Sequence, residues 1–233
     1  MPYHHFFIKR REEREERERA FYFYENGSLL LEKLIASCNA KPIPLHTFSP
    51  QQLPQATNNY PAEHLGFYWY RGSLEGRIVL IKRLGFWTDI AINDLVISAQ
   101  MSGHSNVLKP IGCSYQKKKK KPIGYCLHTR IPILVLEFAA NGFLENRIYV
   151  SRVTELQHQP MVWERRLKIA RQIAHALSYL HTAFPRPVIH LGILLYSFLL
   201  DEHDVPKLSN FYYSISIPEG EADVEFYNDQ FTP

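Results

Sequence analysis

Residues 163–181, WERRLKIARQIAHALSYLH, carry the strongest helical pattern in the chain. The side chains that follow a 3.6-residue period are Trp163, Leu167, Ala170, Ala174, Leu177 and His181. Ile173 and Leu180 widen this stripe. Such spacing predicts an amphipathic helix over these residues.

The sequence on the N-terminal side of this helix predicts a sheet. Residues 69–74 and 77–83 are β-rich runs joined by Glu75-Gly76, which predicts a hairpin. We also expect a helix over 90–101 and strands over 107–111 and 131–138. Short strands are expected after the long helix, at 188–189, 198–200 and 207–208. Strands first and helices later predict an α+β fold with two segregated lobes.

The first 61 residues form a different kind of sequence. Residues 9–19, KRREEREERER, mix both signs of charge at spacings that allow i,i+4 pairs, so an exposed helix is expected. A second helix over 29–35 is predicted, with Ser28 as its N-cap. Residues 41–61 contain five prolines and predict a linker with a short helix near 50–58.

Charge and cysteine content exclude several classes of protein. Lysine and arginine number 27 and acidic residues 23, so the net charge is +4. Lys117–Lys121 supplies five of these charges, and the remainder is 4 − 5 = −1. A basic excess confined to one loop does not favour nucleic-acid binding. Three cysteines predict reduced thiols, and no apolar run is long enough to span a membrane. We expect a cytoplasmic protein, with recruitment to the plasma membrane through anionic lipid as an alternative.

A short internal repeat flanks the lysine run. The sequence KPIGC at 109–113 recurs as KPIGYC at 121–126. A local duplication inside a loop between two strands is one interpretation, because long surface loops cost little entropy. A gene-model artefact is an equal alternative.

Several motifs, in this order, resemble a protein kinase of the plant receptor-like type, from about Phe48 to Gly220. Val79-Leu80-Ile81-Lys82 resembles the V-A-I-K strand, and residues 134–138, LVLEF, with Asn141-Gly142 resemble the hinge. Residues 163–181 resemble helix αE. Residues 26–38, NGSLLLEKLIASC, and 214–220, SISIPEG, resemble more closely the wall-associated-kinase-like ZRK pseudokinases.

The resemblance implies a protein-kinase-like two-lobe fold. Residues 1–47 would hold the charged helix, a docking helix and a linker. Residues 48–138 would form the N-lobe, with a Lys-rich loop insertion at 114–121. Residues 139–233 would form a partial C-lobe that ends after a degenerate D-F-G position. Without further helices, the apolar face of residues 163–181 is expected to stay exposed.

The nucleotide pocket implied by the resemblance is altered. Lys82, Asp94 and Glu137 stand at its cofactor-binding positions, and Asp94 replaces a glutamate. Lys82 is about equally expected to bind phosphate or to be a structural or solvated lysine. Leu80 replaces a small alanine and Trp69 a small β-branched residue, so both are expected to fill the adenine volume. The phosphate-covering Gly loop is absent, because only Gly66 and Gly72 remain in its window.

The catalytic positions implied by the resemblance are lost. Residues 190–197, HLGILLYS, stand where H-R-D-x-K-x-x-N is expected. Gly192 replaces the base, Leu194 the lysine and Ser197 a metal ligand, while His190 is expected to be structural. Asn210-Phe211-Tyr212 stands at D-F-G, and a neutral Asn210 is a poor Mg²⁺ ligand. We expect no functional catalytic residue, no metal site, and weak or absent ATP and Mg²⁺ binding.

The sequence therefore leads to three hypotheses. The first is an inactive kinase-like adaptor in plant immune signalling, whose protein partners are a nucleotide-binding leucine-rich-repeat receptor or other kinases, as the ZRK resemblance implies. The second is a residual Ser/Thr protein kinase or ATP-binding protein, which depends on Lys82 and the hinge. The third is a non-functional truncated gene product.

Overall fold

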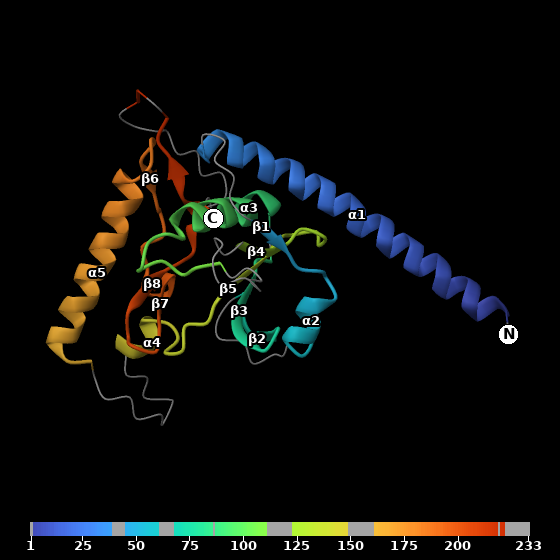
Figure 1. Ribbon diagram of the computed structural model, residues 1–233, viewed down its shortest axis with the longest axis horizontal. Coiled ribbons are helices and arrows are strands. Elements are labelled where there is room, and N and C mark those ends of the chain that lie inside the picture. The colour runs from blue at the N-terminus through green and yellow to red at the C-terminus, as the bar shows by residue number, and fades with distance from the viewer. Residues whose placement is uncertain are drawn as a thin grey trace, which may run out of the picture.

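The computed structural model describes residues 2–38, 45–60, 68–85, 87–110, 123–148, 161–218 and 220–221. A sheet lies at the centre, with a long helix on one side and a second helix on the other (Figure 1). The fold is the mixed α+β arrangement expected from the order of strands and helices.

The larger sheet has the strand order β1-β4-β5-β3-β2. Its strands are β1 (Leu45–Thr47), β2 (Trp69–Leu74), β3 (Arg77–Arg83), β4 (Ile123–Cys126) and β5 (Ile133–Glu137). The β2–β3 hairpin is confirmed with its turn at Glu75-Gly76, where both residues have positive φ. Strand β5 confirms the strand expected at 131–138, although it is shorter than predicted at both ends. Strand β1 pairs in parallel with β4, whereas the other strand pairs are antiparallel.

Alternation along β3 separates two cores. Val79 and Ile81 face the side covered by α2 (Gln52–Ala56) and pack with Phe48 and Leu53. Leu80 faces the opposite side, where helix α3 (Thr88–Met101) lies, and packs with Leu95. Successive side chains of a strand point to opposite faces, so Lys82 lies on the α3 side and Arg83 on the α2 side.

The second lobe is built around α5 (Trp163–Thr182), which confirms the predicted helix. Its other elements are α4 (Glu145–Ile148), β6 (Val188–Ile189), η1 (Leu195–Ser197), β7 (Phe198–Leu200), β8 (Pro206–Leu208), η2 (Phe211–Tyr213) and β9 (Ile215–Ser216). Pairs β7–β8 and β6–β9 form two small sheets. Ile169, Ala176 and Leu180 of α5 are buried, while Trp163 and Leu167 are 67% and 51% exposed. The expected exposed apolar face is therefore present.

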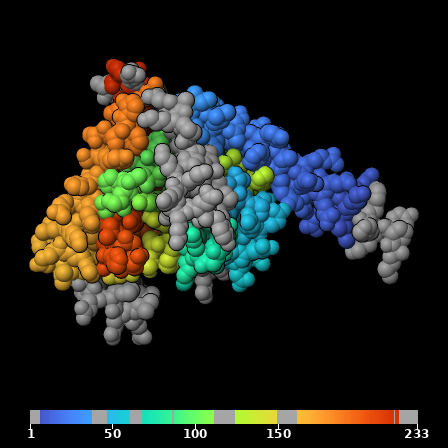
Figure 2. Space-filling model, in the orientation of Figure 1, coloured from blue at the N-terminus to red at the C-terminus, as the bar shows by residue number. Residues whose placement is uncertain are grey.

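The N-terminal segment is one helix, α1 (Pro2–Cys38), of 37 residues. At 1.5 Å per residue it is about 55 Å long, and its first half projects away from the body (Figures 1 and 2). The prediction of a separate second helix capped by Ser28 is wrong. Asn26 is buried and donates two hydrogen bonds from its side chain, to Leu127 O and Thr129 O. Helix α1 therefore packs against the rest of the protein at Asn26 and stays helical through residues 26–28.

Three further expectations need correction. Residues 41–61 are not only a linker, because β1 lies within them beside the confirmed short helix α2. Residues 107–110 do not form a strand but make isolated bridges from Val107 to Leu208 and from Pro110 to Leu136. The second copy of the repeat supplies strand β4 and is not loop. The Lys-rich insertion itself lies outside the described residues. Within the described part of the chain, no helix is both long and apolar enough to cross a bilayer.

Candidate functional site

Lys82 lies at the centre of the interface between the two lobes. Its side chain is 1% exposed, and its Nζ forms a salt bridge with Asp94 of α3, which is equally buried. The ring centroids of Trp69 and Tyr212 lie 5.1 Å and 4.7 Å from the same Nζ. A carboxylate and two aromatic faces therefore surround this ammonium group. The alternative of a solvated lysine is wrong.

Asp94 also binds the segment at the degenerate D-F-G position. Its Oδ1 accepts a hydrogen bond of 2.8 Å from Phe211 N, while Oδ2 accepts one from Lys82. The neighbouring Asn93 Nδ2 lies within 3.3 Å of three backbone oxygens, those of Phe211, Tyr212 and Ser214. Helix α3 is thus fixed both to strand β3 and to η2. The shorter aspartate does reach Lys82, because α3 lies close against the sheet.

Burial sets the protonation behaviour of this group. Desolvation lowers the pKa of Lys82, and the attraction of Asp94 opposes that shift. Burial raises the pKa of Tyr212 well above its usual range, and a hydrogen bond with Tyr196 raises it further. Tyr212 therefore stays a neutral phenol whose ring faces the lysine. The Trp69 and Tyr212 rings, more than the ion pair itself, leave this lysine little freedom to bind a phosphate.

Leu80 and Trp69 lie within one packed cluster. Leu80 is fully buried and Trp69 is 3% exposed, and both pack with Phe143 and Leu199 of the second lobe. The Trp69 ring makes an edge contact with Phe143 at 6.0 Å. Leu80 and Trp69 therefore belong to a close-packed apolar cluster that joins the two lobes.

Glu137, the remaining predicted pocket residue, belongs to the backbone frame of the hinge. Its Oε1 accepts a hydrogen bond from Lys109 N, and its own N donates to Lys109 O. Burial raises the pKa of its carboxyl. The structure therefore does not bring Glu137 into the Lys82–Asp94 group.

The loop of residues 190–197 is held by hydrogen bonds among its own members. Gly192 N donates to His190 Nδ1 at 3.2 Å, and His190 Nε2 lies 2.9 Å from Ser209 O, so the ring is neutral with its proton on Nε2. Ser197 Oγ donates to Gly192 O at 2.7 Å. Leu194 is half exposed and brings no charged group to the interface between the lobes. This loop keeps a defined shape without a carboxylate.

The metal positions do not fit Mg²⁺. The Ser197 hydroxyl is occupied by Gly192 O, and residue 192 has no side chain. Asn210 has left-handed backbone angles and donates from Nδ2 to Tyr196 O, while its buried Oδ1 has no hydrogen-bond partner among the described residues. One neutral oxygen cannot replace the charged oxygens that Mg²⁺ requires. No step of phosphoryl transfer can be assigned to these side chains.

A second polar centre joins the hinge to α5, and the sequence analysis did not find it. Asp204 accepts hydrogen bonds or ion pairs from Asn141, Arg147 and Arg165, with Arg165 Nη1 at 2.8 Å. Its side chain is only 10% exposed. Glu202 and His203 of the same turn are exposed, whereas Asp204 is largely buried.

Comparisons with known proteins agree with this architecture. A family model described as protein tyrosine and serine/threonine kinase matches residues 89–229. Serine/threonine-protein kinase ZRK1 of Arabidopsis thaliana is 38% identical over 88% of this chain and 58% of its own length. From the same plant, the non-functional pseudokinase ZRK2 is 40% identical over 88% and 56%. Serine/threonine-protein kinase ZRK7 is 41% identical over 87% and 74%. The chain thus spans less than two thirds of the first two relatives.

Proposed function

The chain belongs to the protein tyrosine and serine/threonine kinase family, among its ZRK members, and from this premise we propose that it is a catalytically inactive, kinase-like adaptor. Relatives with kinase names and relatives with pseudokinase names both match it, so family membership alone does not decide activity. The proposal depends on the residues of this chain.

The state of Lys82 is the observation that carries the proposal. Phosphoryl transfer requires a lysine that can reach phosphate, metal ligands and a carboxylate beside the nucleophile. Here the lysine is enclosed by Asp94, Trp69 and Tyr212, and Gly192 stands in place of the base. Loss of a positioned base alone removes a factor of about 10²–10⁴ in rate. Together these features support a protein that acts by binding.

Transfer of label from radioactive ATP tests this proposal. We expect none onto the purified chain or onto a general protein substrate, with either Mg²⁺ or Mn²⁺. The double variant Gly192→Asp/Asn210→Asp sharpens the test, because a Cβ at residue 192 meets no atom closer than 3.6 Å. Asn210 has a positive φ that aspartate also tolerates. This variant should remain inactive, since Lys82 stays enclosed; label transfer by the unmodified chain would refute the proposal.

Residual nucleotide binding is the second candidate, favoured by the intact Lys82–Asp94 pair. It predicts that ATP raises the melting temperature and that the rise disappears in Lys82→Ala. The shift must be measured within each variant, because the substitution itself changes stability. An unchanged melting temperature at saturating ATP with either metal rejects this candidate.

As partner we propose a nucleotide-binding leucine-rich-repeat receptor of plant immune signalling, as the ZRK resemblance implies, or another kinase. Co-purification from plant tissue tests this, with and without residues 1–41. Absence of any association for both chains would count against the adaptor role. A chain that is insoluble when expressed and undetectable in tissue would instead indicate a non-functional product.

A further inference from the structure

Helix α1 carries a line of exposed side chains on the side that it turns away from the rest of the protein. They recur at alternating spacings of three and four residues, which is the pattern of a coiled-coil seam. We call this line the α1 seam. Its members are all exposed, and they are Phe7, Arg10, Arg14, Arg17, Phe21, Tyr24, Ser28, Leu31 and Ile35.

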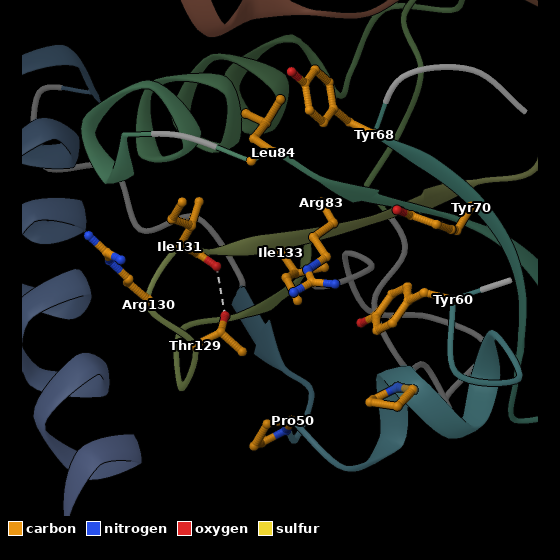
Figure 3. Close-up of a pocket in the computed structure, with 12 residues that line it drawn as sticks. Pro50, Tyr60, Tyr68, Tyr70, Arg83, Leu84, Thr129, Arg130, Ile131 and Ile133 are labelled. Carbon is orange, nitrogen blue, oxygen red and sulfur yellow. Dashed lines mark hydrogen bonds between the residues drawn. The ribbon is translucent and has the colours of Figure 1, made fainter. Parts of the chain in front are cut away.

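The opposite side of α1 is already used by contacts within the chain. Asn26 donates to the β4–β5 turn, and Leu30 is buried in the core that α1 shares with α3. Farther towards the N-terminus, Glu15 and Arg19 line a hollow between α1 and the same turn. Figure 3 shows the Arg130 side chain of this turn directed towards α1. Because an α-helix turns by about 100° per residue, these side chains and the α1 seam lie on different sides of the helix.

The second half of the α1 seam is apolar and uncovered. Phe21, Tyr24, Leu31 and Ile35 are between 58% and 74% exposed. Single exposed apolar residues are common on protein surfaces, but four large ones along one face of one helix form a continuous stripe. Anchors at this spacing are typical of a helix that binds a second helix.

Charge along the α1 seam decides the direction of the second helix. Arginines occupy the first half, at residues 10, 14 and 17, whereas Glu25 and Glu32 flank the second half. Both glutamates are exposed, and neither forms a salt bridge within the described part of the chain. A parallel pair of α1 helices would bring arginines against arginines, which is unfavourable. An antiparallel pair brings the arginines of each helix to the glutamates of the other.

One antiparallel register matches the whole α1 seam to itself. With a twofold axis at Phe21, residues equally distant from Phe21 along the two helices lie level across the interface. The paired halves then overlap over about 42 Å at 1.5 Å per residue. The level pairs are Phe7 with Ile35, Arg10 with Glu32, Arg17 with Glu25, and Phe21 with the Phe21 of the other copy.

We propose that α1 binds the α1 of a second copy of this chain, in an antiparallel interface centred on Phe21. The first half of each helix, which projects from its own body (Figures 1 and 2), covers the apolar second half of the other. The two bodies lie on the outer sides of the helix pair, because Asn26 and Leu30 face away from the α1 seam. A dimer goes beyond the proposed adaptor role, and its test is separate from the tests of catalysis and of partner binding.

Sedimentation velocity of the full chain over a range of concentrations tests the dimer. We expect a monomer–dimer equilibrium with a Kd below about 100 µM. F21E places two like charges at the twofold axis and should weaken dimerisation at least tenfold. The matched control is W163E, because Trp163 is also a large exposed apolar residue on a helix but lies on α5. W163E should dimerise as the unmodified chain does.

Exchange of charges across the interface tests the register. R10E/R17E and E25R/E32R should each lose the dimer when alone, because both place like charges on level positions. An equimolar mixture of the two should form a heterodimer, since every level pair then joins opposite charges again. Melting curves and circular dichroism will show that each variant folds. The proposal is overturned by a chain that stays monomeric, by unchanged dimerisation in F21E, by an equal loss in W163E, or by a mixture that associates no better than its components.

Discussion

Lys82 and Arg83 are neighbours in the sequence and both carry a positive charge, yet Lys82 is buried and Arg83 lies at the surface. Lys82 is 1% exposed and paired with a buried carboxylate, whereas Arg83 is exposed and its guanidinium lies over the Tyr60 ring. The period of two along β3 directs them to opposite faces. One cation helps to hold the lobes together, and the other lies at the surface beside an aromatic ring. The functional surface of this chain is therefore best sought away from the pocket that its family uses.

The largest loss of stability is expected for Lys82→Met. It leaves the Asp94 carboxylate buried without its cation, and breaking a buried pair costs about 3–5 kcal/mol in the free energy of unfolding. Urea denaturation measures this loss. The control is Lys82→Met/Asp94→Asn, which removes both charges, keeps an acceptor for Phe211 N and should recover much of the stability. A single variant as stable as the unmodified chain would show that the pair is not structural.

Asn26→Ala tests whether the packing of α1 against the β4–β5 turn depends on the buried Asn26 side chain. Asn26 is 2% exposed and its side chain serves two backbone oxygens in the β4–β5 turn. Leaving these groups unpaired should lower the free energy of unfolding by about 1–3 kcal/mol. Hydrogen exchange should show the loss at residues 127–131 and in α1, with Ser28→Ala, an exposed neighbour, as control. Unchanged exchange in the turn would contradict this role.

The free energy of unfolding should depend on pH, because His190 is buried in the second lobe beside Phe211. Burial lowers the pKa of His190 from its ordinary value of 6.5, and Gly192 N already occupies Nδ1. Below that pH the unfolded chain binds a proton that the folded chain does not, so stability falls as pH falls. We expect a loss on the order of 1 kcal/mol between about pH 7 and pH 5.5.

The matched variants for this pH series are His190→Gln and His203→Gln. The first should flatten the pH dependence, whereas the second, in the exposed β7–β8 turn, should not change it. Burial lowers the pKa of His104 as well, so some dependence should remain in His190→Gln. Equal slopes in both variants would refute the assignment to His190.

The smallest effect is expected for Arg83→Gln. An exposed arginine that forms no ion pair with the described residues should change the free energy of unfolding by no more than about 0.5 kcal/mol. Arg71→Gln should behave alike, because it removes the same kind of ring contact. A large loss of stability in Arg83→Gln alone would show that Arg83 has a structural role and would weaken the contrast with Lys82.

Much of the fold could be read from local pattern. The hairpin, helix α3 and helix α5 each depend on short-range periodicity or turn chemistry, and all three were predicted. The errors concern contacts between distant segments. Strand β1 exists because β4 pairs with it, and α1 continues through Gly27 because Asn26 docks on the β4–β5 turn. Residues 26–28 alone carry the signal of a helix start.

The candidate site was predictable in identity and not in geometry. The resemblance placed Lys82, Asp94, His190 and Asn210 at their family positions. It could not show that Tyr212 would lie over Lys82, or that Asp94 would bind Phe211 N. The contacts of Asp204 were missed because its partners Asn141, Arg147 and Arg165 are far from it in the sequence and follow no spacing rule.

Helix α3 is bonded to both lobes. Asp94 accepts hydrogen bonds from Lys82 and from Phe211 N, and the Asn93 side chain donates to backbone oxygens of the segment around η2. A chain pinned in this way presents surfaces from both lobes in one fixed relation before a partner arrives. A partner that spans both lobes then avoids the entropy cost of ordering two moving bodies. Preorganisation of this kind favours slow dissociation, which suits the adaptor role that we propose.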